Sequence, residues 1–150
     1  MNLLQALAND HEQAKSALES VLAADDAKER TERFKEFKAM MTAHSRSEEK
    51  VFYRRLEKTE EAKSKALKGE VEHEIVDGLM DELSRSRAKE SDRWTARCKV
   101  LQELIEHHVE EEEGEFFKVA EKLFDEETLE RMGEEFEADK GKHYSRRHAA

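Results

Sequence analysis

Apolar residues recur at steps of three and four positions along most of the chain, which is the spacing of one face of an α-helix. The pattern divides into five segments, and we expect helices at about residues 2–24, 27–58, 61–89, 92–124 and 126–140. Residues able to cap a helix stand at the boundaries, namely Asp26, Thr59, Ser91 and Asp125. Short connections make neighbouring helices antiparallel, so the sequence predicts an all-α, up-down-up-down four-helix bundle with a short fifth C-terminal helix.

The chain divides into two parts by this pattern. Residues 1–124 form the predicted bundle, and residues 125–150 form the short C-terminal helix and a basic tail. We expect the tail from Lys140 onward to be frayed, with His143 and His148 exposed to solvent.

Composition limits the size of the core. Leu, Ile, Val and Phe make up 29 of the 150 residues, which with a net charge of -10 approaches the composition of disordered chains. There is no proline, however, and the abundant Ala, Glu, Lys, Leu and Arg favour helix. The low apolar content therefore indicates narrow apolar stripes on long helices whose outer faces are solvated.

Charge and cysteine usage exclude several classes of protein. A net charge of -10 disfavours binding to nucleic acid or to an anionic membrane surface. The mean hydropathy of -0.99 leaves no window for a membrane span, and no basic segment precedes an apolar run at the start, so we expect no signal peptide. Cys98 is the one cysteine, which excludes an internal disulfide and fits a cytoplasmic location.

Each of the first four predicted helices has a histidine on its apolar face, where Leu or Phe would be expected. These residues are His11, His44, His73 and His108. Glu48 and Glu112 follow two of them by one helical turn and lie on the same apolar faces. Because a buried carboxylate is costly unless it is paired or bound to a cation, these positions require an explanation.

The six polar side chains are also expected at a similar depth in the bundle. With a rise of ~1.5 Å per residue, their distances from the connecting turns place them within one or two helical turns of a common layer. Four imidazoles and two carboxylates in one layer predict a dinuclear metal site. The alternative, a metal-free structural bundle with hydrogen-bonded core histidines, would bury six polar groups together, two of them anionic.

The fourth helix offers two overlapping His-x-x-x-Glu pairs. The face of His108 and Glu112 continues through apolar residues to Leu123, whereas the face of His107 and Glu111 runs into solvated positions. We therefore choose His108 and Glu112 as ligands and expect His107 at the rim, with His107 as the alternative ligand.

These residues resemble the hemerythrin-like, HHE cation-binding family over about residues 3–124. The segments that carry the resemblance are Asp10-His11-Glu12, His44-Ser45-Arg46-Ser47-Glu48-Glu49, Glu72-His73-Glu74 and His108-Val109-Glu110-Glu111-Glu112-Glu113. The resemblance implies a four-helix bundle with a non-haem centre of two iron ions, bridged by an oxo or hydroxo group. The ligands that it implies are His11, His44, Glu48, His73, His108 and Glu112.

The chain departs from that family at three positions. Arg54 and Lys118 replace a usual proline, so we expect both helices to continue unbroken. Respiratory hemerythrins carry a second histidine one turn after the third-helix ligand, where this chain has Asp77. Asp77 is a further ligand, a neighbour of the ligands or an exposed residue; its charge would favour ferric iron and thus a redox or sensing role over reversible oxygen carriage.

The resemblance supports several functions. The leading hypothesis is a cytoplasmic di-iron protein that binds O2 or a related small oxidant, with a small diatomic molecule or peroxide as its ligand. The alternatives are an enzyme that processes peroxide or nitric oxide, a protein for iron storage or donation, and a metal-free bundle. The metal itself stays open, because imidazole and carboxylate sites also accept zinc or manganese. The sequence identifies no proton donor. Tyr53 directly follows the helical turn of a predicted ligand, but its position next to Phe52 leaves open whether it faces outward.

Overall fold

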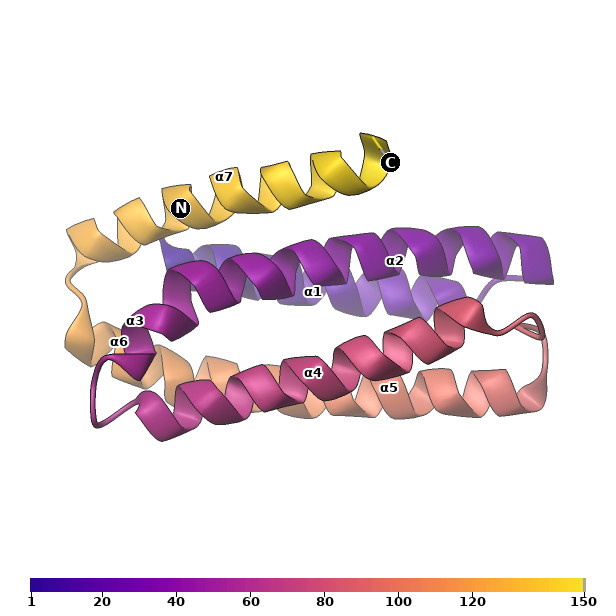
Figure 1. Cartoon of the computed structure of the whole chain (residues 1–150), viewed down its shortest axis with the longest axis horizontal. Coiled ribbons are helices and arrows are strands. Elements are labelled where there is room, and N and C mark those ends of the chain that lie inside the picture. The colour runs from indigo at the N-terminus through magenta and orange to yellow at the C-terminus, as the bar shows by residue number, and fades with distance from the viewer. Residues whose placement is uncertain (150) are drawn as a thin grey trace.

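Four long helical segments run alternately up and down, and a fifth helix lies along the outside of two of them (Figure 1). The computed structural model describes residues 1–149, with side chains described for residues 1–144. The bundle consists of α1 (Leu3–Leu22), α2 (Ala27–Glu48) continued by η1 (Glu49–Tyr53) and α3 (Arg54–Glu57), α4 (Lys63–Arg85), and α5 (Asp92–Glu111) continued by η2 (Glu112–Phe116) and α6 (Phe117–Leu123). No strand occurs within residues 1–149, so the predicted all-α bundle is confirmed.

Three of the predicted caps begin helices. The side chain of Asp26 accepts a hydrogen bond from the Glu29 amide at 2.8 Å, and Asp125 accepts one from the Thr128 amide at 2.8 Å. Ser91 accepts one from the amide of Trp94 at 3.1 Å. Each bond satisfies an amide that would otherwise lack a partner in the first helical turn.

The third segment is shorter than the sequence predicts. The helix α4 begins at Lys63, with Ala62 at its cap position. Thr59 caps the turn that leads into it, because its hydroxyl accepts a hydrogen bond from the Ala62 amide at 3.2 Å. The helix also ends at Arg85 instead of near residue 89, since Ser86 is extended. The amine of Lys89 donates to the carbonyls of Ser84 at 3.0 Å and Ser86 at 2.5 Å, which stabilises this ending.

Two wide helical turns lie within the segments that the sequence predicts to be unbroken. The amide of Arg54 donates to the carbonyl of Glu49, and the amide of Phe117 donates to that of Glu112. Such i to i+5 bonds define a π turn, which adds one residue to the helix without interrupting it. Both segments therefore continue as expected, but the residues after Glu48 and Glu112 are rotated relative to a regular α-helix.

The core consists of two apolar clusters separated by a polar layer. Large members of one cluster are Leu3, Leu7, Phe52, Phe116 and Phe136. Large members of the other are Leu18, Phe34, Met80, Trp94 and Leu101. The histidines on the apolar faces lie between the two, so the polar layer is enclosed at both ends by side chains that exclude water.

The fifth helix, α7 (Glu126–Ala149), extends well past the predicted end near residue 140. It packs on α1 and α2 through Leu129, Met132 and Phe136, which are buried. From Lys140 to Ala149 the chain is helical, where the sequence predicts a frayed tail, and Ala150 lies outside the described residues. His143 is half-buried, with its Nε2 3.0 Å from Asp139 Oδ2, rather than exposed; the side chain of His148 lies outside the described residues. Within the described residues, no helix combines the length and apolar character needed to cross a membrane.

The contact between α7 and the start of α1 gives a test of the fold. A Cβ on Gly133 would lie 2.4 Å from the carbonyl oxygen of Met1, whereas one on Gly141 would meet nothing within 4 Å. We expect Gly133→Ala to lower the free energy of unfolding by about 1–3 kcal/mol through overpacking. Gly141→Ala should instead raise it by about 0.5–1 kcal/mol, because alanine favours helix. Denaturant unfolding of both variants checks this, and equal stabilisation by both would contradict the packing.

Candidate metal centre

The structure brings the six predicted site residues together in the polar layer. His11 comes from α1, His44 and Glu48 from α2, His73 from α4, His108 from α5, and Glu112 is the first residue of η2. All six side chains are buried. Their donor atoms form two groups that share Glu48, each able to hold a metal ion: His11, His44, Glu48 and Glu112 in one, and Glu48, His73 and His108 in the other.

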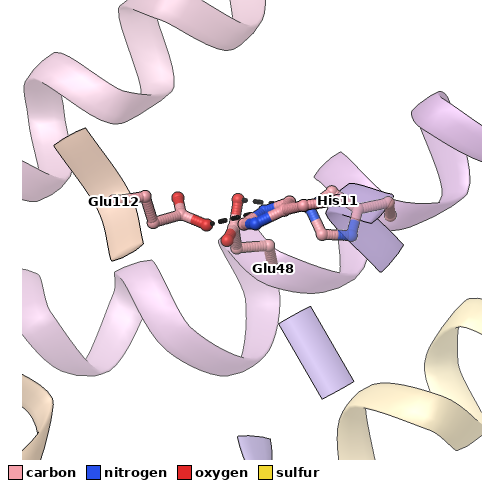
Figure 2. A group of neighbouring side chains, drawn as sticks. His11, Glu48 and Glu112 are labelled. Atoms are coloured by element: carbon pink, nitrogen blue, oxygen red, sulfur yellow. Dashed lines mark ion pairs between the residues drawn. The ribbon is translucent and has the colours of Figure 1, made fainter. Parts of the chain in front are cut away.

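Each carboxylate lies between two imidazoles. Glu112 places Oε1 3.2 Å from His11 Nε2 and Oε2 3.3 Å from His108 Nε2. Glu48 Oε1 lies 3.1 Å from His73 Nε2 and 3.8 Å from His44 Nε2. Figure 2 shows Glu48 and Glu112 pointing toward each other, with His11 beside them. Donor atoms that each lie ~2.1 Å from one metal at a right angle are ~3 Å apart, so these spacings suit shared coordination.

Several of these atoms have no hydrogen-bond partner. They are Nε2 of His11 and of His73, both carboxylate oxygens of Glu48, and Oε1 of Glu112. Buried polar atoms in native proteins are almost always satisfied, because leaving them unpaired costs free energy. Since the unsatisfied atoms are nitrogen and oxygen donors that face one another, the residues present fit a bound cation.

A second set of carboxylates orients the four histidines. The Nδ1 atoms lie at hydrogen-bond distance from Glu113 for His11 (2.7 Å), Asp10 for His44 (2.8 Å), Glu49 for His73 (2.6 Å) and Glu72 for His108 (2.7 Å). Because an ionised carboxylate only accepts, each Nδ1–H donates. In a neutral ring the Nε2 lone pair then points into the centre, which is the form that a metal ion binds. The sequence signal for these partners is their position, since all four directly adjoin a residue of the predicted site.

Tyr53, whose direction the sequence left open, points into the core. The π turn η1 rotates it into the core, where it is fully buried. Its hydroxyl donates to Glu112 Oε2 at 2.5 Å and lies 3.3 Å from His108 Nε2. Its ring stacks on that of His73, with 5.2 Å between ring centroids. Glu48 and Tyr53 are five residues apart. A π turn brings residues at this spacing to one face of the helix, whereas a regular α-helix does not, so the spacing is the sequence signal for Tyr53.

Asp77 does not reach the centre. It accepts a hydrogen bond from Arg46 at 2.7 Å, and Arg46 also donates to Glu49 at 3.1 Å. Since Glu49 is the partner of His73, Asp77 is connected to the site only through Arg46. Asp77 is thus a neighbour of the site and not a ligand, and the expectation that its charge favours ferric iron stays a prediction.

His107 and His108 lie on different faces of α5. His108 is buried, whereas the side chain of His107 is 69% exposed. His107 forms a separate group with Glu72 and Glu111 at the edge of the bundle.

Two histidines of the centre are expected to carry protons when no metal is bound. Burial by itself lowers the pKa of His11, but Glu112, Glu48 and Glu113 outweigh it and raise that pKa to about 9. Burial also lowers the pKa of His108, but hydrogen bonds to Glu112 and Glu72 raise that pKa to about 10.

The two central carboxylates share their charge unequally. Burial and the neighbouring charge of Glu112 raise the pKa of Glu48 well above its ordinary value. Burial also acts to raise the pKa of Glu112, but the neighbouring Glu48, His108 and His11 hold it well below the ordinary value. Burial lowers the pKa of His44, which therefore stays neutral. The metal-free centre thus balances its charge with protons.

The chain is similar to known proteins over most of its length. The family model of the hemerythrin HHE cation-binding domain matches residues 2–120. An uncharacterized hemerythrin-like protein of Schizosaccharomyces pombe is 29% identical over 137 residues, which cover 90% of this chain and 67% of that protein. No solved structure matches the chain significantly.

The protonated histidines predict a pH dependence of metal binding. A metal ion needs the neutral imidazoles, so binding at pH 7 should release at least two protons, those of His11 and His108. Affinity should therefore rise with pH until these groups lose their protons near pH 9 and 10. Calorimetric titration with Zn²⁺ in buffers of different ionisation enthalpy measures the protons released; a value near zero at pH 7 would contradict the assignment.

The raised pKa values of His11 and His108 also determine how the stability of the metal-free chain changes with pH. A histidine whose pKa is raised on folding contributes stability in full below its unfolded value of 6.5, and loses it as pH rises through the folded value. Without metal, the contribution of His11 and His108 to the free energy of unfolding should therefore decrease between neutral pH and pH 10.

Proposed function

Because the chain belongs to the hemerythrin HHE cation-binding family, we propose that it is a non-haem di-iron protein that binds O2 or a related small oxidant. The observation that carries the proposal is the layer of facing, unsatisfied nitrogen and oxygen donors. In this assignment Glu48, which belongs to both donor groups, and Glu112, which lies between His11 and His108, would hold both ions. His11 and His44 would complete one position, and the remaining two histidines would complete the other. A metal-free structural bundle would leave these buried donors without partners.

A bound pair of iron ions would supply redox chemistry and open positions for a small diatomic molecule or peroxide. Glu113, Asp10, Glu49 and Glu72 hold the imidazole rings in the orientation that such binding needs. Asp77 stands where respiratory relatives carry a further histidine, so the position of His73 and His108 has one imidazole fewer. This favours access for a small ligand there.

Water is excluded from the centre by the apolar clusters on both sides. A groove of about 470 Å³ between α1 and α5 adjoins His11 and is also lined by Glu12, Glu106, His107 and Glu110. Its carboxylates would attract a cation, and its size admits a small oxidant, so we infer that it is the route to the centre. Buried Cys98, the one cysteine, is compatible with the reducing cytoplasm in which we place the protein.

A second candidate function is turnover of peroxide or nitric oxide, and the position of Tyr53 favours it. Its hydroxyl lies beside Glu112 and His108, where a proton can pass to a ligand in the centre. Burial and the neighbouring charges of Glu112 and Glu48 raise the pKa of Tyr53 well above its ordinary value, so the hydroxyl keeps its proton.

Metal loading tests the proposed centre. We expect two iron ions per chain after anaerobic incubation with Fe²⁺ and removal of excess metal, measured by elemental analysis. The optical spectrum should change on admission of air, because the ions then react with oxygen. Trace metal only, or an unchanged spectrum in a loaded sample, would count against the proposal.

The two neighbouring histidines of α5 provide a matched pair for that experiment. His108→Ala should lower the iron content, because it removes a buried donor, whereas His107→Ala should leave it at the wild-type level. Glu48→Ala should lose both ions, since Glu48 belongs to both groups. Loss of metal in His107→Ala with retention in His108→Ala would reverse the assignment.

Tyr53→Phe separates binding from turnover. The variant keeps the ring against His73 but removes the hydroxyl, so iron content should stay the same. If the protein consumes peroxide or nitric oxide with Tyr53 as proton donor, the rate should fall by roughly 10²-fold or more. Turnover at the wild-type rate in this variant would exclude that role of Tyr53.

A further inference from the structure

The helix α7 lies outside residues 2–120 that the family model matches, yet it reaches the polar layer. It runs along α1 and α2, which supply His11 and His44, on the side of the bundle away from α4 and α5 (Figure 1). Any effect of α7 on the centre is therefore exerted on the half that contains His11 and His44.

The first contact between α7 and the centre is a ring contact. Phe136 is fully buried, and the centroid of its ring lies 5.6 Å from that of His44, with the rings nearly perpendicular. This contact closes the outer side of the imidazole and limits its movement toward α7.

The second contact is a polar chain that ends on the same imidazole. Lys140 places Nζ 2.7 Å from Asp10 Oδ1, and the other oxygen of Asp10 lies 2.8 Å from His44 Nδ1. Asp10 therefore uses one oxygen for the lysine of α7 and the other for the histidine. The Nδ1–H of His44 donates to Asp10, which leaves Nε2 directed at the centre.

Asp10 needs a neighbouring cation more than do the three glutamates that bind the other histidines, because it is the most buried of the four carboxylates. The side chain of Asp10 is 5% exposed, compared with 21% for Glu72, 25% for Glu49 and 40% for Glu113. Water can solvate the three glutamates, whereas a carboxylate as buried as Asp10 needs a compensating charge. The ammonium of Lys140 supplies it, and the side chain of Lys140 is itself only 22% exposed.

Resting on the proposed metal centre, we propose that Lys140 is a positioning residue for the His11 and His44 half of the site, acting through Asp10. Without the ammonium, the buried carboxylate loses its compensating charge and its bond to His44 weakens. The imidazole is then held less firmly, and the metal position that it completes binds more weakly. The His73 and His108 half keeps its own supports, Glu49 and Glu72, and is unaffected.

The test is a Co²⁺ titration of the full chain, followed by the visible absorption of the bound ion. Wild type should bind two equivalents. In Lys140→Met the affinity for one equivalent should fall at least ~10-fold, as for other groups that orient a metal-bound histidine, while the other equivalent stays unchanged. Lys142→Met on the same helix is the matched control and should behave as wild type, and Lys140→Arg should restore binding.

Two further backgrounds assign the weakened equivalent. In His73→Ala the position of His11 and His44 remains, and adding Lys140→Met should weaken Co²⁺ binding by the same factor. In His44→Ala the position of His73 and His108 remains, and adding Lys140→Met should change nothing. Circular dichroism and thermal unfolding of each metal-free variant establish that the bundle is retained.

The outcomes separate the two proposals. Fewer than two equivalents of Co²⁺ in the wild type would overturn the dinuclear centre itself. Two equivalents in the wild type and two of undiminished affinity in Lys140→Met would overturn the role of Lys140 alone. Equal weakening of both equivalents would also overturn it, because a general loss of stability, rather than the contact with Asp10, would then be responsible.

Discussion

Burial of four imidazoles and two carboxylates in the middle of a helical bundle is the constraint on which this structure depends. Such groups are costly in an apolar interior unless each polar atom has a partner. On the outer side of the layer, each imidazole Nδ1 has a carboxylate partner. On the inner side, several nitrogen and oxygen donors face one another without a hydrogen-bond partner. Each long helix contributes one histidine, so the layer fixes the rotation of all four helices at once.

The apolar clusters above and below this layer serve the same arrangement. They enclose the donors in a region of low polarity, where the interaction between a cation and a carboxylate is stronger than in water. The two π turns belong to this arrangement as well. The turn after Glu48 widens the helix and directs Tyr53 inward, so the site gains a hydroxyl group that a regular helix would direct elsewhere. The other turn begins at Glu112 itself.

The supports of the two halves differ in kind. The imidazoles of α4 and α5 are held by half-exposed glutamates, one of which continues to Asp77 through Arg46. His44 is held by a deeply buried aspartate whose compensating charge comes from α7. In a chain with a net charge of -10, Lys140 thus places a positive charge beside a carboxylate that water scarcely reaches. The fifth helix is part of the environment of the centre as well as of the outer packing.

The sequence by itself determined the helices, their antiparallel order and the layer in which the histidines and glutamates meet. Hydrophobic periodicity and caps are local properties, and a histidine at an apolar position of each helix is visible without knowledge of the neighbours. The family resemblance follows from the same residues. The inward rotation of Tyr53, the balance of Asp77 by Arg46 and the extension of α7 to Ala149 were not predictable in this way. Only the tertiary structure decided them, because an i to i+5 turn shifts the face of a helix by one residue, and because a long charged side chain finds its partner on another helix.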